Sequence, residues 1–443
     1  MKLLSLHTPA NHAQRSNLAH SLRPQAARSW RVALYSHDTM GLGHTRRNVL
    51  IAQTLASCGL PLDILLIRGM GEGLGANLPA GIDCLTLPAL HKQSDGSYSA
   101  RNLSLELADI VQLRAHTLHA ALTAFAPDVL IVDNVPRGAQ NELDLTLAQL
   151  RRTGHTRCVL GLRDVIDSPH VVQREWQQAA NEATINAYYD ALWIYGDPQV
   201  YDSVYAYQFA PQIALRTSYI GYLDQRARLQ YATQPIPLEL PSGRMALCLL
   251  GGGQDGIQLA EAFVGATLPN DMYAVLLTGP FMPAEQCARL EALAAQHERL
   301  HILSTAAEPT QLLMHADKLV TMGGYNTVAE LLSFEKHALV VPRVRPRQEQ
   351  LIRAEQLAAL GLIDMLHPDK LSPQALSHWL AQPTRTPDVH NRLDMQALNR
   401  LPHLLASLLG LNNTAKAQPA LFERQHVRMP AVLKSVRAMG MMP

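Results

Sequence analysis

Residues 316–332 read ADKLVTMGGYNTVAELL, and this stretch contains one complete strand–turn–helix unit. The apolar run 317–321 predicts a strand, the paired glycines predict a tight turn, and the pattern of 325–335 predicts a helix. A second apolar run follows at 338–342, so the helix connects two strands of the same kind. Because a strand, a helix and a strand in this order form a parallel crossover, the stretch predicts an α/β fold.

The same alternation extends over most of the chain. We predict further strands at 31–36, 62–67, 82–87, 128–132, 157–161, 190–195, 244–250, 272–278 and 300–304. The helices expected between strands include 45–58, 102–125, 256–267, 284–297 and 347–360. Continuous apolar runs are typical of strands that are covered on both faces. The segment 225–242 contains three prolines and divides two such series. We therefore predict two doubly wound, Rossmann-like domains in tandem.

The predicted domain boundaries follow from this division and from charge. A length of 443 residues suggests two to three domains, at about 100–200 residues per domain. Residues 1–29 carry four basic residues and no acid, whereas residues 411–443 carry five basic residues and one acid. Such tails are either poorly ordered chain ends or weak contacts to anionic membrane lipid. We predict an N-terminal basic tail at 1–29, an N-terminal domain at 30–225, a C-terminal domain at 226–390, and a helix with a basic tail at 391–443.

Composition excludes several classes of protein. With 38 basic and 37 acidic residues the formal net charge is +1, which argues against a nucleic-acid binder that is basic overall. The five cysteines lie far apart and form no C-x-x-C, as expected of reduced thiols in a cytosolic protein. No apolar run approaches the ~18 residues of a membrane span. We predict a cytoplasmic protein without nucleic-acid partners, with the inner face of the plasma membrane as the alternative contact of its tails.

Ligands of doubly wound sheets bind at the carboxyl ends of the strands, so the residues that follow each strand are the site candidates. After strand 31–36, Gly41 and Gly43 permit a tight turn and the close approach of a ligand. His44 follows them, and histidine suits general-base catalysis because it titrates near neutral pH. The alternative is that His44 caps or packs on this turn. A dinucleotide fingerprint is excluded, because Arg46 stands where the third glycine is needed.

The strands of the second half are followed by loops suited to phosphate and sugar. The triplet Gly251, Gly252 and Gly253 lets backbone amides approach a phosphate, or else forms a plain turn. Gly323, Gly324 and Thr327 lie at the next helix start, and the Glu330 carboxylate can accept hydrogen bonds from a vicinal diol such as ribose. Arg343, Arg345 and Arg347 suit phosphate, and Glu349 with Gln350 suits sugar hydroxyls.

Acceptor-side candidates come from the first half. They are Asp133 and Asn134 after strand 128–132, and Arg163, Asp164 and His170 after strand 157–161. Asp133 can also orient His44. The alternative for each of them is a loop residue that forms caps and turns.

Several of these segments resemble GT-B-fold glycosyltransferases, in particular family 28, to which the enzyme that adds N-acetylglucosamine to lipid I belongs. The resemblance is carried by residues 316–332, by VVPRVRPRQEQLIRAEQL (340–357) and by the MGLGH turn (40–44). Other segments are similar to a bacterial set of predicted glycosyltransferases, namely VDNVPRGAQNEL (132–143), GLRDVIDSPHVVQREW (161–176) and IYGDPQVYD (194–202).

The resemblance implies a GT-B fold with a cleft between the domains. It implies donor diphosphate binding at the 251–253 glycines, Gly324 and Thr327, ribose at Glu330, the base near Thr305 and Ala306, the donor sugar at Glu349 and Gln350, and a general base at His44. The implied reaction is transfer of a hexosyl-type sugar from a nucleotide donor, by default a UDP-sugar, to an acceptor hydroxyl, with inversion.

The donor is a co-substrate in this scheme, and no cofactor or metal is expected because no D-x-D occurs in the chain. The acceptor is unknown, with a lipid-linked molecule or a glycan as candidates. Two alternatives stay open, namely a nucleotide-sugar epimerase of the same fold and a non-catalytic subunit that binds the donor.

Overall fold

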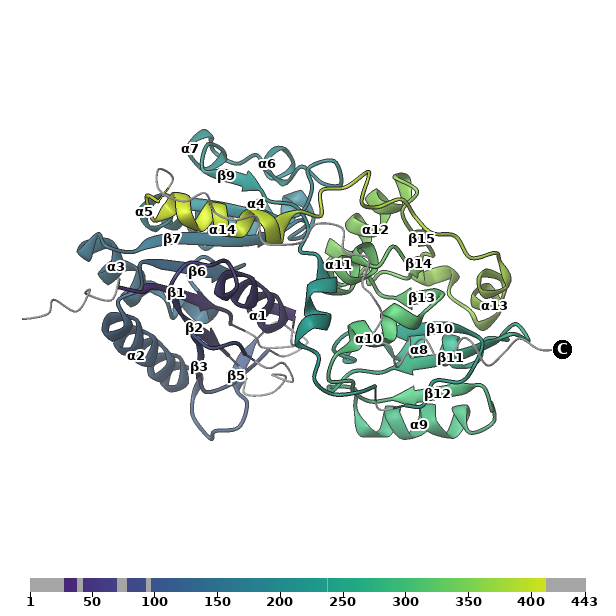
Figure 1. Ribbon diagram of the computed structural model, residues 1–443. Coiled ribbons are helices and arrows are strands. Elements are labelled where there is room, and N and C mark those ends of the chain that lie inside the picture. Colours follow the sequence, from purple (N-terminus) through teal and green to yellow (C-terminus); the bar gives the residue numbers. More distant parts are fainter. Residues whose placement is uncertain (1–27, 38–42, 70–77, 93–96, 237, 412–443) are drawn as a thin grey trace, which may run out of the picture.

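The computed structural model describes residues 28–37, 43–69, 78–92, 97–236 and 238–411. Within these ranges the chain forms two parallel β-sheets, each covered by helices on both faces (Figure 1). The predicted doubly wound α/β fold is therefore confirmed. Gly41 lies outside the described residues, as do nearly all of the N-terminal tail and the basic part of the C-terminal tail.

The N-terminal sheet has seven strands in the order β3-β2-β1-β6-β7-β8-β9. Its strands are β1 (Trp30–Tyr35), β2 (Leu62–Arg68), β3 (Ile82–Thr86), β6 (Val129–Asp133), β7 (Arg157–Arg163), β8 (Ala191–Tyr195) and β9 (Thr217–Tyr219). The helices that follow these strands include α1 (Gly43–Ala56), α2 (Leu107–Phe125), α3 (Asp144–Thr153), α4 (Pro169–Gln178), α5 (Asn181–Tyr188), α6 (Ser203–Ala206) and α7 (Pro211–Ala214). The order of strands reverses between β1 and β6, which is where ligands of such sheets bind.

The side chains of β1 show why residues 32–35 are all apolar. Val32 and Leu34 pack with α1 and with α14 (Ala397–Leu408), near the C-terminus of the described chain. Ala33 and Tyr35 pack with α2 and α3 on the opposite face. Because side chains alternate between the faces of a strand and both faces are covered, each of these four positions is apolar.

The C-terminal sheet has six strands in the order β12-β11-β10-β13-β14-β15. Its strands are β10 (Arg244–Leu249), β11 (Met272–Leu277), β12 (Leu300–Leu303), β13 (Lys318–Thr321), β14 (His337–Val340) and β15 (Asp364–Met365). One face packs with α8 (Ile257–Val264), α9 (Ala284–Ala294) and α13 (Pro373–Ala381). The other packs with α10 (Pro309–His315), α11 (Tyr325–Ser333) and α12 (Glu349–Ala359). The sheet reverses between β10 and β13.

Three parts of the fold differ from the sequence-based expectation. The helix expected at 102–125 begins only at Leu107, because residues 101–106 leave Leu103 and Leu105 exposed. The hairpin of β4 (Leu90–Lys92) and β5 (Tyr98–Ala100) was not expected, and neither were β9 and β15. Each of these strands has two or three residues, which is too short for a periodic pattern.

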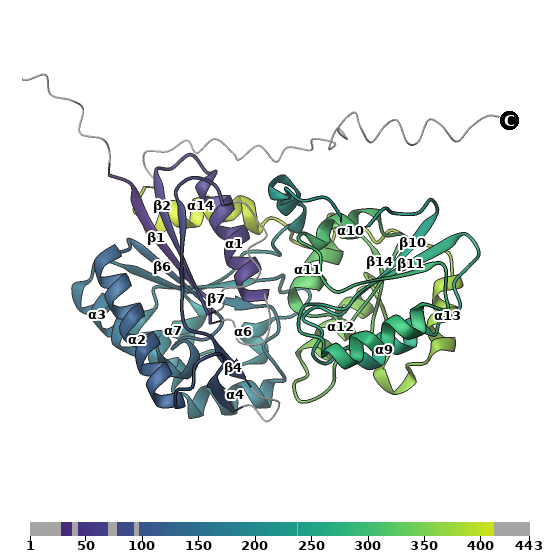
Figure 2. The same ribbon diagram turned by 90° about the horizontal axis from the view of Figure 1, so that it is seen from below.

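The two domains are joined by η2 (Gln225–Tyr231) and the segment that leads to β10. The described chain then returns, so that α14 packs beside α1 of the N-terminal domain (Figures 1 and 2). The C-terminal helix of the described chain is thus part of the N-terminal domain in space. The two domains lie side by side with their strand ends between them (Figure 2).

Candidate active site between the domains

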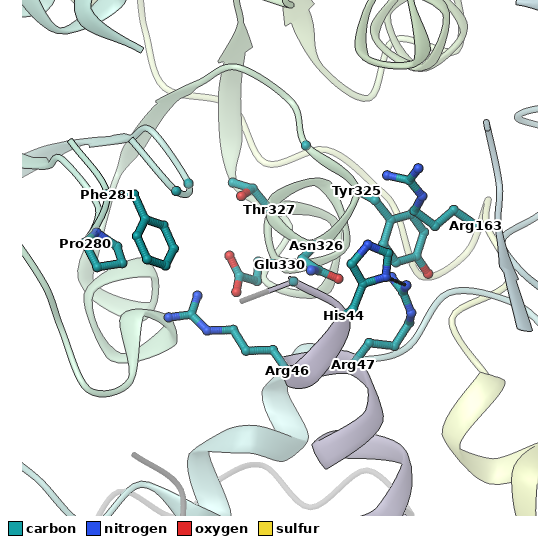
Figure 3. Close-up of a pocket in the computed structure, with 14 residues that line it drawn as sticks. His44, Arg46, Arg47, Arg163, Pro280, Phe281, Tyr325, Asn326, Thr327 and Glu330 are labelled. Carbon is teal, nitrogen blue, oxygen red and sulfur yellow. Dashed lines mark hydrogen bonds between the residues drawn. The ribbon is translucent and has the colours of Figure 1, made fainter. Parts of the chain in front are cut away.

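A pocket lies where the carboxyl ends of the two sheets meet. It is lined from the N-terminal domain by Gly43, His44, Arg46, Arg47 and Arg163, and from the C-terminal domain by Gly251, Gly252, Pro280, Phe281, Gly324, Tyr325, Asn326, Thr327 and Glu330. Pro280 and Phe281 lie at one end of the pocket, Arg163 and Tyr325 at the other, and His44 and Thr327 between them (Figure 3). The structure therefore brings residues of all three predicted glycine turns together around one pocket.

His44 lies on the first turn of α1 and contacts Asp133, the last residue of β6. Its Nδ1 forms a short hydrogen bond with Oδ2 of Asp133. Because β1 and β6 are neighbours at the switch point of the sheet, their carboxyl ends place these two residues side by side. Asp133 is fully buried, whereas the side chain of His44 is 21% exposed and reaches the pocket.

Arg47 holds the Asp133 carboxylate from the other side. Its Nη2 lies 2.7 Å from both carboxylate oxygens, and its Nε donates to Oδ1 at 3.0 Å. Burial alone would raise the pKa of Asp133, but Arg47 and then His44 lower it well below its usual value. An ionised Asp133 only accepts hydrogen bonds, so Nδ1 of His44 is the donor and Nε2 is left as the acceptor. This is the tautomer that a general base requires.

The lowered pKa of Asp133 predicts how stability changes with pH. A carboxylate whose pKa is lower in the folded chain stabilises it above the unfolded pKa of about 3.9, and this contribution is lost on acidification. We expect Asp133→Asn to have a lower free energy of unfolding than wild type at pH 7, and we expect this difference to shrink between pH 5 and pH 3. Urea unfolding of both proteins at pH 7, 5, 4 and 3 measures the difference. A difference that stays constant over this range would contradict the prediction.

The C-terminal side of the pocket presents backbone amides. Gly251 and Gly252 line it, and Gly324 is the N-cap of α11 without a side-chain cap. The first N–H groups of a helix have no partner within the helix and favour an anion. Thr327 lies on the first turn of α11 and also lines the pocket. Gly251, Gly252, Gly324 and Thr327, which were predicted to hold a diphosphate, thus all line this pocket.

Gly253 and Gly323 do not line the pocket. Gly253 has φ +91°, and a Cβ there would clash with the carbonyl oxygen of Thr278. Its role in the structure is thus the turn itself. The carbonyl of Gly323 accepts a hydrogen bond from Arg353 at 3.3 Å instead.

Glu330 is buried at the pocket wall and already has a cationic partner. Nη1 of Arg228 donates to it at 2.7 Å, and Nη2 of the same arginine lies 2.9 Å from Glu308. Burial raises the pKa of Glu330, and Arg228 opposes this effect. Arg46 points toward the same region (Figure 3), and its guanidinium forms no ion pair with any described residue. Burial lowers the pKa of Arg46, as expected of a cation that lacks a partner.

Several predicted candidates lie outside the pocket. Thr305 is exposed, and neither it nor Ala306 lines the pocket. Glu349 and Gln350 are both held by Arg343, through its guanidinium at 2.6 Å and its backbone N–H at 3.0 Å respectively. Asn134, Arg345 and His170 also lie outside the lining.

Two arginine and aspartate candidates need correction, because they join the domains to one another. Arg347 was expected to face phosphate, but its guanidinium pairs with Asp167 and Glu175, each at 3.0 Å. Asp164 was expected on the acceptor side, but it is buried in an ion pair with Arg353 of α12. Carboxylates of one domain meet arginines of the other at these positions, so neither side chain is available to a ligand. Arg343 is also paired, but within the C-terminal domain, with Asp255 at 2.9 Å.

Sequence reasoning missed part of the lining. Arg47 lies three residues after His44, a spacing that places both on one face of α1. Pro280 and Phe281 follow β11, so they would have been found by examining the residues after that strand as well. Tyr325 and Asn326 stand inside the quoted glycine turn. A Cβ at Gly43 would clash with the side chain of Asn326, so this glycine permits close approach of the two domains.

Comparison with known proteins identifies the fold. No protein-family model and no curated protein sequence matches the chain. Among solved structures it is similar to glycosyltransferase VinC in complex with dTDP (TM-score 0.54, 15% identity, covering 86% of this chain and 99% of that one). It is also similar to the glycotransferase of kitacinnamycin (TM-score 0.52, 16% identity, covering 86% of this chain and 96% of that one).

A third similar structure is a putative UDP-N-acetylglucosamine 2-epimerase from Listeria monocytogenes (TM-score 0.52, 14% identity, covering 87% of this chain and 98% of that one). At such identities the likeness concerns the fold alone, and it confirms the predicted GT-B architecture of two Rossmann-like domains.

Within the described part of the chain, no helix is long and apolar enough to cross a membrane. The same residues contain no cluster of three metal-ligating side chains.

Proposed function

We propose that this chain is a glycosyltransferase that moves a hexosyl-type sugar from a nucleotide donor, a UDP-sugar by default, to an acceptor hydroxyl. The observation that carries the proposal is the His44–Asp133 pair, which lies across one pocket from the uncapped N-terminus of α11. A base on one wall and an anion-binding wall opposite are what sugar transfer from a nucleotide diphosphate requires. The resemblance to family 28 supports the same reaction.

In this mechanism the acceptor oxygen forms a bond to the anomeric carbon while the bond from that carbon to the diphosphate oxygen breaks. Nε2 of His44 takes the acceptor proton, and Asp133 stabilises the imidazolium that forms. The leaving diphosphate keeps the bonding electron pair. Amides of Gly251, Gly252 and the α11 N-terminus stabilise its charge, together with Arg46. A single displacement of this kind inverts the anomeric centre and uses no metal.

Nucleotide binding is the first test. We expect UDP or another nucleoside diphosphate to raise the melting temperature of the protein and to bind measurably by calorimetry. Arg46→Gln should weaken this binding by roughly tenfold or more, since a hydrogen bond to a charged group contributes about 1.5–3 kcal/mol. Arg226→Gln is the matched control, because Arg226 pairs with Asp224 outside the pocket. Failure of UDP-, dTDP-, GDP- and ADP-sugars to bind would refute the proposal.

The second candidate is a nucleotide-sugar epimerase, because one of the similar structures is that of a putative UDP-N-acetylglucosamine 2-epimerase. An epimerase needs no acceptor. Incubation of the protein with the bound donor alone, followed by chromatography of the sugar, separates the two functions. An altered sugar still attached to the nucleotide indicates the epimerase, whereas transfer that depends on an added acceptor indicates the transferase.

A further inference from the structure

Three polar atoms in and beside the pocket are buried and, within the part of the chain that the structure describes, have no hydrogen-bond partner. They are Nε of Arg163, Oη of Tyr325 and Oε2 of Glu349. Tyr325 is 4% exposed and Glu349 is 5% exposed. The three residues stand at the end of β7, the start of α11 and the start of α12, so both domains contribute. Buried polar groups are almost always paired, and a set left unpaired at strand ends indicates a place for ligand atoms.

Among the described residues, no carboxylate forms an ion pair with Arg163. The two carboxylates that act on it electrostatically are Glu349 and Asp133. Glu349 is paired with Arg343 at 2.6 Å, and Asp133 with Arg47 at 2.7 Å. Burial lowers the pKa of the Arg163 guanidinium, and the neighbouring cations Arg47 and Arg353 lower it as well. A cation in this condition gains most from an anionic ligand.

The position of Arg163 in the pocket indicates which part of a substrate would carry this anionic group. In Figure 3, Phe281 and Arg46 lie on one side of His44, and Arg163 lies on the other. Thr327, on the first turn of α11, whose N-terminal amides are expected to hold the diphosphate, lies between them (Figure 3). The group at Arg163 is therefore beyond the diphosphate, where the transferred sugar and the acceptor meet.

We propose that Arg163 binds a carboxylate or phosphate group carried by the sugar being transferred or by the acceptor, so that one partner of the reaction is an acidic sugar. This proposal rests on the proposed glycosyltransferase function. The planar guanidinium suits two-point binding of a carboxylate or phosphate, while Tyr325 donates and Glu349 accepts hydrogen bonds with neighbouring hydroxyls. A neutral sugar would leave the charge of the half-buried Arg163 without a counterion.

The donor arm of the test measures binding of UDP, UDP-glucose and UDP-glucuronate by calorimetry to wild type, Arg163→Gln, Arg163→Lys and Arg46→Gln. If the protein binds dTDP-, GDP- or ADP-sugars instead of UDP-sugars, the same compounds are used with that nucleotide. If the anion belongs to the donor, wild type binds UDP-glucuronate about tenfold more tightly than UDP-glucose, and Arg163→Gln removes this preference. Arg163→Gln should bind UDP with an affinity within about twofold of that of wild type. Arg163→Lys should retain part of the preference for UDP-glucuronate, and Arg46→Gln should bind all three ligands more weakly than wild type.

The acceptor arm titrates glucuronate, glucose 6-phosphate and glucose into enzyme saturated with UDP. If the anion belongs to the acceptor, the two acidic sugars bind to wild type, Arg163→Gln loses them, and glucose binds to neither. The proposal is overturned if wild type prefers the acidic compound in neither arm, or if Arg163→Gln weakens UDP itself as much as UDP-glucuronate. A protein that binds UDP-sugars without this preference keeps the proposed function, whereas one that binds no nucleotide loses both.

Discussion

We expect the substitution His44→Ala to lower kcat by about 10²- to 10⁴-fold, the usual contribution of a general base, while nucleotide affinity stays close to that of wild type. The expectation follows from the geometry around the ring. Asp133 accepts from Nδ1 and thereby leaves Nε2 free to take a proton. His44 lies on the N-terminal wall of the pocket, whereas the amides that hold a diphosphate belong to the C-terminal wall. Loss of the base therefore affects the chemical step more than donor binding.

The chain offers a matched control for this experiment. His155 also pairs with an aspartate, since its Nε2 lies 2.8 Å from Asp128, and its side chain is 46% exposed. Asp128 and His155 precede β6 and β7, so they lie at the amino ends of these strands, whereas the pocket lies at the carboxyl ends. His155→Ala should leave kcat unchanged. Turnover measured with saturating donor and acceptor tests both variants, and an unchanged kcat in His44→Ala would remove His44 from the mechanism.

The second large effect concerns the contact between the domains. Arg353→Met should lower the free energy of unfolding by about 3–5 kcal/mol, because it leaves the charge of Asp164 buried without its partner. Arg353 and Asp164 are 0% and 1% exposed, and Nη2 of the arginine lies 2.7 Å from Oδ1 of the aspartate. After the substitution, Asp164 keeps the hydroxyl of Tyr222 at 2.9 Å as its side-chain donor. This hydroxyl and the backbone N–H of Val165, which donates to Oδ1 at 2.6 Å, are neutral donors and do not replace a bidentate guanidinium.

A surface ion pair gives the comparison that this prediction needs. Arg226 pairs with Asp224, and the arginine side chain is 50% exposed. Arg226→Met should cost at most about 1 kcal/mol, since exposed pairs contribute little. Urea unfolding at pH 7 measures both variants. The double variant Arg353→Met/Asp164→Leu should recover part of the loss, because it removes the unpaired charge as well. A loss in Arg353→Met no larger than that in Arg226→Met would show that the buried pair does not hold the domains together.

Much of the fold was predictable because its signals are local. Each long strand is a continuous apolar run covered on both faces, and each glycine turn stands directly after its strand, as at Gly251 and Gly324. The strands β9 and β15 were not predictable, because two or three residues carry no period. The pairing of His44 with Asp133 lies between these cases. It follows from the adjacency of β1 and β6, which the doubly wound topology implies once the strands are known.

The sequence by itself determined the two α/β domains, the strand ends at which a site forms, and the residue types gathered there. Only the tertiary structure decided which of the similar arginines pair with carboxylates of the other domain. Arg163, Arg347 and Arg353 all stand at strand ends or on the helix that follows one. Arg347 and Arg353 are neutralised by carboxylates more than 170 positions away in the chain, while Arg163 is not. No sequence period records such pairing, because it depends on which faces of two separate sheets meet.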